Sequence, residues 1–187
     1  IGTTSGGTDL VSWADNETAT SVTKTGLTLS NGTAYYISVR ATDNAGNVAT
    51  VVTSNGVTID TAAPIAGSVM DSTSIDMDWT RSTTTLTAAW SGFSDAISGI
   101  QKYEYAIGTT SGGTDVVTWT DNSTTTSVTK TGLALTNGTT YYISVRATDN
   151  VGNVSNIATA DGITVDTDNP VLTTPIEGSL ATDIDYQ

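Results

Sequence analysis

The sequence predicts an all-β fold, and composition, alternation and repetition each point to it. Thr, Ser, Gly, Val and Asp dominate, so β-branched and turn-forming residues are abundant while helix-forming residues are scarce. Apolar residues alternate with polar ones over short stretches, which is typical of half-buried strands. One long segment also occurs twice, which indicates a repeated structural unit.

The alternation is clearest between residues 85 and 148. In Thr85–Ser91, the side chains of Leu86, Ala88 and Trp90 fall on one face of the expected strand. The other expected strands are Gln101–Ile107, Asp115–Trp119, Thr126–Thr131, Thr140–Thr148 and Asn156–Val165. Turns with glycine, at Ser111-Gly112-Gly113 and Asn137-Gly138, separate several of them. About seven short strands in about 100 residues suit a two-sheet β-sandwich.

The repeat defines the expected domain organisation. Residues 1–60 align with residues 107–166 without gaps, and roughly 43 of about 60 aligned positions are identical at a shift of about 106 residues. We therefore expect this stretch to be a segment of a longer tandem array. The expected parts are the C-terminal part of a first sandwich at 1–60, a linker at 61–64, a complete sandwich at 65–166, a linker at 167–169, and the N-terminal start of a third repeat at 170–187.

Both expected linkers are short and end in a proline, in the sequences IDTAAP (59–64) and VDTDNP (165–170). Proline fixes its own φ angle and restricts the preceding residue to extended geometry. Neighbouring units are therefore expected to be joined with limited freedom rather than by a flexible tether.

A motif around the sixth strand resembles a known family. It consists of Leu135, Gly138-Thr139, Tyr141, Ile143, Val145 and Ala147, and it recurs as Leu29, Gly32-Thr33, Tyr35, Ile37, Val39 and Ala41. This motif is similar to that of the bacterial fibronectin type III-like and related immunoglobulin-like repeats of large cell-surface or secreted proteins. The resemblance implies tandem immunoglobulin-like sandwiches in which Tyr141 forms a tyrosine corner, its hydroxyl bonding nearby backbone. The expected structural core consists of Trp90, Tyr103, Tyr105, Leu135, Tyr141, Ile143, Val145, Tyr35, Ile37 and Val39.

Charge and composition exclude several functions. The formal charge of -13 disfavours nucleic acid and anionic lipid surfaces as partners. No run of about 18 apolar residues occurs, so no direct membrane insertion is expected in this segment. The sequence has no Cys and no His, which removes disulfides, thiolate metal sites and the commonest general base. We therefore expect a protein that is not an enzyme.

Carboxylates are the only abundant side-chain groups in the sequence that could bind a metal ion or act in catalysis. In a sandwich of this topology, Asp60 from the linker, Asp95 from the loop after the second strand, and Asp149 with Asn150 from the loop after the sixth converge at one end. Asp166 and Asp168 would take part in the next junction. Because Ca²⁺ takes about 6–8 oxygen ligands, the first hypothesis is a calcium site at each domain junction. The alternative is that these residues cap turns and keep the surface soluble.

Two further groups of residues have both a functional and a structural interpretation. Asp76 and Asp78, with Asp71 nearby, could belong to a calcium loop or a carboxylate pair, but a solvated strand face is the favoured interpretation. Exposed aromatic rings could stack on sugars, although cross-strand packing is favoured for them. The rings on the outward side of their strands are Tyr36 and Tyr142, with Trp13 and Trp119 as further candidates.

Together these observations predict a non-catalytic structural repeat of an extracellular adhesin, stalk or surface filament. Its partners would be the neighbouring repeats of the same chain and a glycan or cell-surface ligand, and Ca²⁺ is the one cofactor considered. The alternative is an accessory spacer or carbohydrate-binding module of a secreted polysaccharide-active enzyme. The composition and the repeat are compatible with either.

Overall fold

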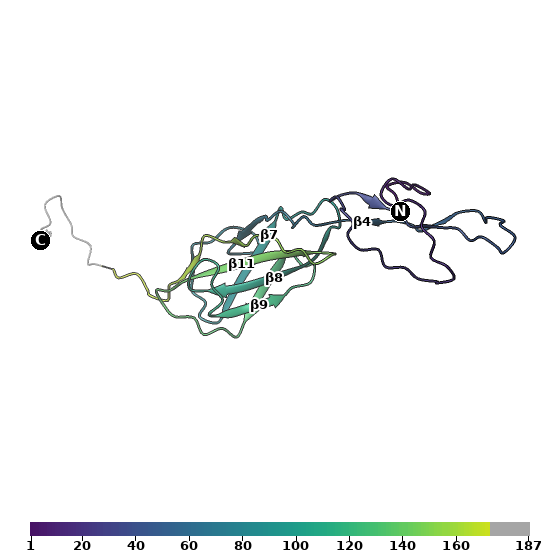
Figure 1. Ribbon diagram of the computed structural model, residues 1–187. Coiled ribbons are helices and arrows are strands. Elements are labelled where there is room, and N and C mark those ends of the chain that lie inside the picture. The colour runs from purple at the N-terminus through teal and green to yellow at the C-terminus, as the bar shows by residue number, and fades with distance from the viewer. Residues whose placement is uncertain (173–187) are drawn as a thin grey trace, which may run out of the picture.

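The computed structural model describes residues 1–172 as an all-β chain whose two parts lie end to end (Figure 1). Residues 65–166 carry the longer strands, and residues 1–60 carry four strands of two residues each. None of the described residues forms a helix long and apolar enough to cross a lipid bilayer.

Residues 65–166 fold into two antiparallel-rich sheets that face each other. The first has the order β10-β7-β5, and the second has the order β6-β13-β11-β8-β9, with β12 also paired to β11. The strands are β5 (Ser68–Met70), β6 (Trp79–Thr80), β7 (Thr85–Ser91), β8 (Ile100–Gly108), β9 (Val117–Asp121), β10 (Ser127–Thr131), β11 (Thr140–Asp149), β12 (Ala158–Thr159) and β13 (Ile163–Val165). This is a β-sandwich, as the alternation of the sequence predicts.

Two strands of the sandwich are interrupted, and one of them was expected from the sequence as a single strand. The first edge strand divides into β5 and β6, because the loop at residues 71–78 carries the chain from one sheet to the other, where β6 pairs in parallel with β13. The expected strand at 156–165 divides into β12 and β13, and Gly162 in the break has a φ of 109° that non-glycine residues rarely adopt. Counting each divided strand once gives seven strands.

The core lies between the two sheets and is built by alternation. On β7, the burial alternates so that Leu86, Ala88 and Trp90 face inward with 2%, 0% and 4% of their surface exposed. The Trp90 ring meets the Tyr103 ring edge to face, with the ring centroids 5.8 Å apart. The other expected core residues buried here are Tyr103, Tyr105, Leu135, Tyr141, Ile143 and Val145.

Tyr141 combines a buried ring with a bonded hydroxyl. The ring is 4% exposed, and the hydroxyl oxygen accepts a hydrogen bond from the Thr136 backbone N–H at 2.9 Å. The same bond joins Ser30 N–H to the Tyr35 hydroxyl at 3.0 Å in the earlier copy. In each copy the bond fixes the turn that leads into the strand carrying the tyrosine.

Removing the Tyr141 hydroxyl should therefore destabilise the sandwich. We expect Tyr141→Phe to lower the free energy of unfolding by about 1–2 kcal/mol, because the Thr136 N–H is partly buried and loses its acceptor. Urea unfolding followed by circular dichroism measures the change. Tyr142→Phe is the matched control, since Tyr142 is half-buried on the opposite face, and it should change the midpoint little.

Residues 1–60 form only part of the same arrangement. Strands β1 (Ala34–Tyr35) and β4 (Val57–Thr58) pair in the register that β11 and β13 use 106 residues later, and β2 (Ser38–Val39) and β3 (Val52–Thr53) pair as β11 and β12 do. Tyr35 is buried. The first copy therefore reproduces the strand pairing of the second copy wherever both partner strands are present.

The expectation that Ile37 and Val39 lie in a core is wrong for this chain. They are 47% and 62% exposed, whereas Ile143 and Val145, at the same positions of the second copy, are 1% and 0% exposed. In the sandwich these positions pack against the opposite sheet, and residues 1–60 align with 107–166, a range that contains neither β5 nor β7. The two residues therefore have the inward pattern, but no second sheet of the described residues covers them.

The same reason explains two segments of residues 1–60 that form no strand. Residues 11–15 and 21–25 correspond to β9 and β10, yet they are irregular in the structure. In the sandwich, β9 pairs with β8 and β10 pairs with β7. Residues 1–60 align with residues 107–166, a range that excludes β7 and all but the end of β8, so the two segments have no such partner among the described residues. Nearly identical sequence thus forms strands in one copy and not in the other.

Candidate functional site

The acidic residues expected at the first junction come together in the structure. Asp60 lies between the two parts of the chain, Asp95 in the loop from β7 to β8, and Asp149 at the end of β11. Each offers one carboxylate oxygen, and these oxygens all lie within 4.8 Å of one another. We call this group the junction cluster.

Backbone N–H groups donate to all three carboxylates, and those of Asp95 and Asp60 come from the loop and the linker. Asp95 Oδ1 accepts hydrogen bonds from the N–H groups of Ile97, Ser98 and Gly99 at 3.1, 2.8 and 2.8 Å. Asp60 accepts from Ala62 N–H within the linker at 3.0 Å and from Ser98 N–H at 3.1 Å. The second bond joins the linker to the loop from β7 to β8, so it ties the linker to the sandwich.

Asp149 is the most enclosed member of the junction cluster. Its side chain is 0% exposed, and it accepts hydrogen bonds from Val151 N–H at 2.9 Å, from Asn153 N–H at 2.8 Å and from Asn153 Nδ2 at 2.7 Å. Burial acts to raise the pKa of this carboxyl, but the hydrogen bonds from Asn153, Val151 and Gly152 outweigh it and hold the pKa below its ordinary value. Asp149 is therefore a carboxylate at neutral pH.

The remaining expected ligand of this junction binds backbone in the structure. Asn150 Nδ2 donates to the Ser98 carbonyl at 2.7 Å, so the amide joins the loop after β11 to the loop from β7 to β8. Asn153 Nδ2 also reaches the Asp60 carbonyl at 3.4 Å. These bonds give the junction cluster a structural role, which is the turn-capping alternative. Calcium binding there stays a prediction.

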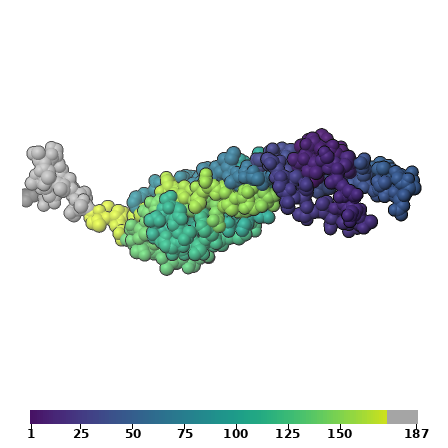
Figure 2. Space-filling model, in the orientation of Figure 1, coloured from purple at the N-terminus to yellow at the C-terminus, as the bar shows by residue number. Residues whose placement is uncertain are grey.

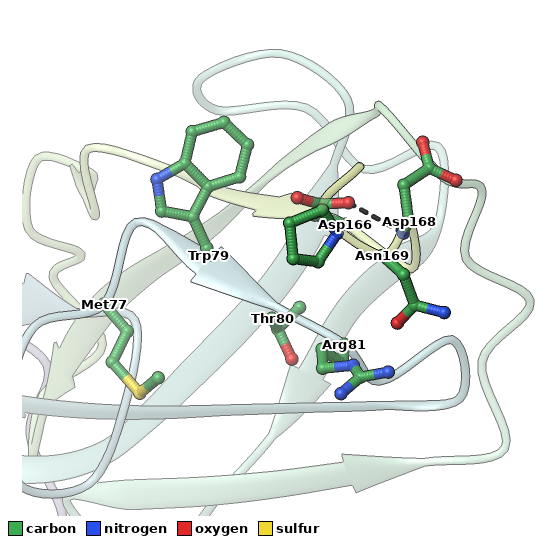
Figure 3. A pocket seen from close by; sticks show the side chains of 8 residues that line it. Met77, Trp79, Thr80, Arg81, Asp166, Asp168 and Asn169 are labelled. Atoms are coloured by element: carbon green, nitrogen blue, oxygen red, sulfur yellow. Dashed lines mark hydrogen bonds between the residues drawn. The ribbon is translucent and has the colours of Figure 1, made fainter. Parts of the chain in front are cut away.

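Asp166 and Asp168 lie away from the junction cluster, beside β6. Asp166 Oδ1 accepts from Asp168 N–H at 2.9 Å, and Asp168 Oδ2 accepts from Asn137 Nδ2 at 3.1 Å. Figure 3 shows them beside a shallow pocket with the Trp79 ring at its side. The pocket is lined by Met77, Trp79, Thr80, Arg81, Asp166, Asp168, Asn169 and Pro170. Most of the third repeat expected at 170–187 lies outside the described residues.

The candidate sugar-stacking rings are partly covered by the chain itself. The guanidinium carbon of Arg146 lies 4.4 Å from the centroid of the Trp119 ring, and Arg40 stands over Trp13 at the same distance. Arg146 is held there by Glu104 on the neighbouring strand, with Nε to Oε2 at 3.0 Å. One face of each indole is therefore occupied.

Tyr142 packs on its own sheet. A Cβ placed on Gly162 would lie 2.7 Å from Tyr142 Cε1, so the ring covers the glycine in the break between β12 and β13. In the earlier copy, a Cβ placed on Gly56 would likewise lie 2.8 Å from Tyr36 Cε1. Glycine at these positions leaves room for the ring, which accounts for the outward tyrosine by cross-strand packing.

Asp71 belongs to a second acidic group, which includes Asp161, a residue not anticipated from the sequence. The solvated face was expected for Asp76 and Asp78, with Asp71 nearby, and the Asp71 side chain is 1% exposed. Asp76 and Asp78 are exposed, as expected. Asp71, Asp76 and Asp161 offer carboxylate oxygens that lie within 4.8 Å of one another, and we call them the loop cluster. Asp161 precedes a glycine between two strands. Asp-Gly is common in ordinary turns, so the sequence alone does not indicate that Asp161 is a ligand.

The fold and these clusters define a β-sandwich protein with acidic groups at its loops. No family model matches the chain. It is similar to Exoglucanase B of Cellulomonas fimi, 38% identical over 161 residues, covering 80% of this chain and 13% of that protein. It is also similar to Chitinase A1 of Niallia circulans, 34% identical over 160 residues, covering 80% of this chain and 20% of that protein. The chain thus matches only a small part of each relative.

Proposed function

We propose that this chain is a non-catalytic accessory spacer of an extracellular polysaccharide-active enzyme. The observation that carries the proposal is that one stretch is similar to parts of an exoglucanase and of a chitinase, covering 13% and 20% of those proteins. A stretch shared by proteins named for different activities does not account for the difference between them. The similarity therefore favours the accessory role over an adhesin, stalk or surface filament.

We further propose that the spacer is a tandem array, with one unit at 65–166 and part of another at 1–60. Two alignments of 161 and 160 residues, each longer than the shift of about 106 residues, support this. Equivalent hydrogen bonds support it too. Thr61 N–H donates to Asn31 Oδ1 at 2.7 Å, and Thr167 N–H donates to Asn137 Oδ1 at 2.8 Å. Both hydrogen bonds lie just after the last strand of a copy, where the chain leaves that unit toward the next.

The shape of the molecule supports a spacing role. Figure 2 shows residues 1–172 as an elongated body in which the first part, the sandwich and residues 167–172 follow one another. The linker is tied to the sandwich through Asp60, Ser98 and Asn153. A Cβ placed on Gly32 would also lie 3.8 Å from Ile97 Cδ1, so the loop from β7 to β8 reaches the first part. Such contacts limit bending between the two parts.

Chemistry supports a spacer over a catalytic or sugar-binding module. The sequence offers neither His nor Cys, and the junction carboxylates accept hydrogen bonds from backbone N–H groups. Arginine covers one face of both Trp13 and Trp119, which leaves less ring surface for a sugar. Neither group resembles the separated carboxylate pair of a glycosidase cleft.

The proposal is tested with the full chain and two insoluble polysaccharides, cellulose and chitin. We expect the chain to stay in the supernatant after sedimentation of either one and to release no reducing ends. Arginine covers one face of Trp13 and of Trp119, and the described residues hold no separated carboxylate pair in a cleft. Trp119→Ala is expected to behave in the same way. Protein in the supernatant and soluble reducing sugar are the quantities measured.

Two results would contradict the spacer. Retention on cellulose or chitin that disappears in Trp119→Ala would assign a carbohydrate-binding module instead. Release of soluble sugar by the purified chain would overturn the non-catalytic assignment. A catalytically active enzyme of the same polysaccharide, assayed in parallel, controls for the accessibility of the substrate.

A further inference from the structure

The loop cluster joins two segments far apart in the sequence. Asp71 directly follows β5, Asp76 lies in the loop from β5 to β6, and Asp161 lies in the turn from β12 to β13. Asp71 Oδ2 accepts a hydrogen bond from Gly162 N–H at 2.9 Å, which brings the loop and the turn together. Asp71 N–H donates in turn to Asp76 Oδ1 at 2.9 Å.

One oxygen of the loop cluster is buried without a partner. Asp71 is 1% exposed, and its Oδ1 accepts no hydrogen bond from the described residues. A buried polar atom left unpaired costs free energy, so native proteins nearly always satisfy such atoms with protein, water or an ion. Burial, opposed by the Gly162 N–H and aided by the charges of Asp76, Asp161 and Asp78, raises the pKa of Asp71 to about 7.

Positive charge from the protein does not compensate the loop cluster. The ion pairs of the described residues join Lys102 to Glu104 and Asp121, and Arg146 to Glu104, all on strands β8, β9 and β11. These ion pairs do not reach the junction cluster either, but its carboxylates accept several hydrogen bonds, from Ser98, Gly99, Asn153 and their neighbours. The loop cluster therefore combines uncompensated charge with a free buried oxygen.

We propose that Asp71, Asp76 and Asp161 bind one calcium ion. Calcium lies 2.3–2.6 Å from its oxygen ligands, so oxygens on opposite sides of one ion stand about 4.6–5.2 Å apart. Three carboxylate oxygens within 4.8 Å of one another can therefore reach the same ion. Asp76 and Asp161 are exposed, which leaves water free to complete the coordination.

The ligand chemistry favours calcium over other divalent cations. All three ligands are carboxylate oxygens, whereas zinc sites in proteins usually include His or Cys, which this sequence lacks. Magnesium requires near-ideal octahedral geometry and keeps most of its water, so three carboxylates from two separate loops suit it less well. Calcium tolerates irregular geometry and takes ligands of this kind.

The ion would tie the two sheets together. Asp71 ends a strand of the β10-β7-β5 sheet, and Asp161 lies between strands that pair with β11 of the other sheet. Between them the chain crosses from the first sheet to the second through residues 71–78. Calcium bound there would fix this crossing and stabilise the folded sandwich by mass action, because the unfolded chain does not assemble the three ligands.

The test is the thermal unfolding of the full chain at pH 8 in EDTA, in calcium and in magnesium. At calcium about 100-fold above its dissociation constant, we expect the midpoint to rise by about 5–10 °C. Asp71→Asn removes the buried charge, so in EDTA its midpoint should equal or exceed that of the wild type, while calcium should leave it unchanged. The wild type should therefore have the higher midpoint in calcium but not in EDTA. Asp161→Asn, at an exposed position, tests the same loss without altering a buried residue.

Asp95→Asn, in the junction cluster, is the matched control and should keep the calcium response. A wild-type midpoint that is the same in EDTA and in calcium would overturn the proposal. So would a calcium response that survives in Asp71→Asn and Asp161→Asn but disappears in Asp95→Asn, because the ion would then bind at the junction. An equal response to magnesium would overturn the assignment to calcium.

Discussion

Trp90→Ala is expected to lower the free energy of unfolding by about 3–5 kcal/mol, as large-to-small changes at buried aromatic positions do. The side chain is 4% exposed, lies on the central strand of the three-stranded sheet and meets Tyr103 edge to face. Since domains are stable by only about 5–15 kcal/mol, the variant should lose a large part of its stability. Urea unfolding followed by far-ultraviolet circular dichroism measures the loss.

Trp90→Phe separates the ring from its polar atom. Trp90 Nε1 is buried and has no hydrogen-bond partner among the described residues. Phenylalanine keeps an aromatic ring against Tyr103 and removes this unpaired donor, so the two effects oppose each other. We expect Trp90→Phe to cost less than about 1.5 kcal/mol. A Trp90→Ala midpoint equal to that of the wild type would show that the ring does not support the core.

The alternation predicted this core because period two identifies which side of a strand is apolar. The inward positions on β7 and β11 could be assigned from the sequence, and Ile143 and Val145 are buried. Their counterparts Ile37 and Val39 carry the same pattern and are exposed. A local pattern specifies the face of a strand, but burial also requires the opposite sheet, and nothing in residues 34–39 reports whether that sheet is present.

The two acidic clusters show the same limit. The junction cluster could be anticipated from topology, because strand order alone brings the loop with Asp95 and the loop with Asp149 to one end of a sandwich. The burial of Asp71 could not. It depends on a hydrogen bond from Gly162, 91 residues later, and on a loop that crosses between sheets instead of continuing as one strand. Period-two spacing assumes an unbroken strand, so it says nothing about the burial of Asp71 where the strand is broken.

Asp149→Ala is expected to lower the thermal midpoint by roughly 5–10 °C, and Asp43→Ala to lower it by less than about 2 °C. The two residues occupy the same position in the two copies and accept the same bonds. Asp43 accepts hydrogen bonds from Ala45 N–H, Asn47 N–H and Asn47 Nδ2 at 2.9, 2.8 and 2.8 Å. These match the bonds that Asp149 accepts from Val151 and Asn153. They differ in exposure, since Asp149 is buried and Asp43 is open to solvent.

The difference between the two variants follows from what replaces the lost acceptor. Around Asp43, water can accept hydrogen bonds from the freed N–H groups. Around Asp149, the freed N–H groups remain buried and unpaired, which costs the full penalty of desolvation. Differential scanning calorimetry of the wild type and both variants at pH 7 measures the comparison. Equal shifts in the two variants would mean that burial does not decide the cost.

The destabilisation by Asp149→Ala should also depend on pH. Hydrogen bonds outweigh burial and hold the pKa of Asp149 below its ordinary value of 3.8 in the folded protein. A group whose folded pKa is depressed contributes stability that is present above the unfolded pKa and is lost as the pH falls through the folded pKa. The gap in midpoint between the wild type and Asp149→Ala should therefore be constant from pH 7 to about pH 5 and narrow below pH 3.8. Protonation weakens the carboxyl as an acceptor, so the wild type then loses part of what the alanine variant lacks at every pH. A gap that stays constant down to pH 2 would show that Asp149 acts through packing rather than as a charged acceptor.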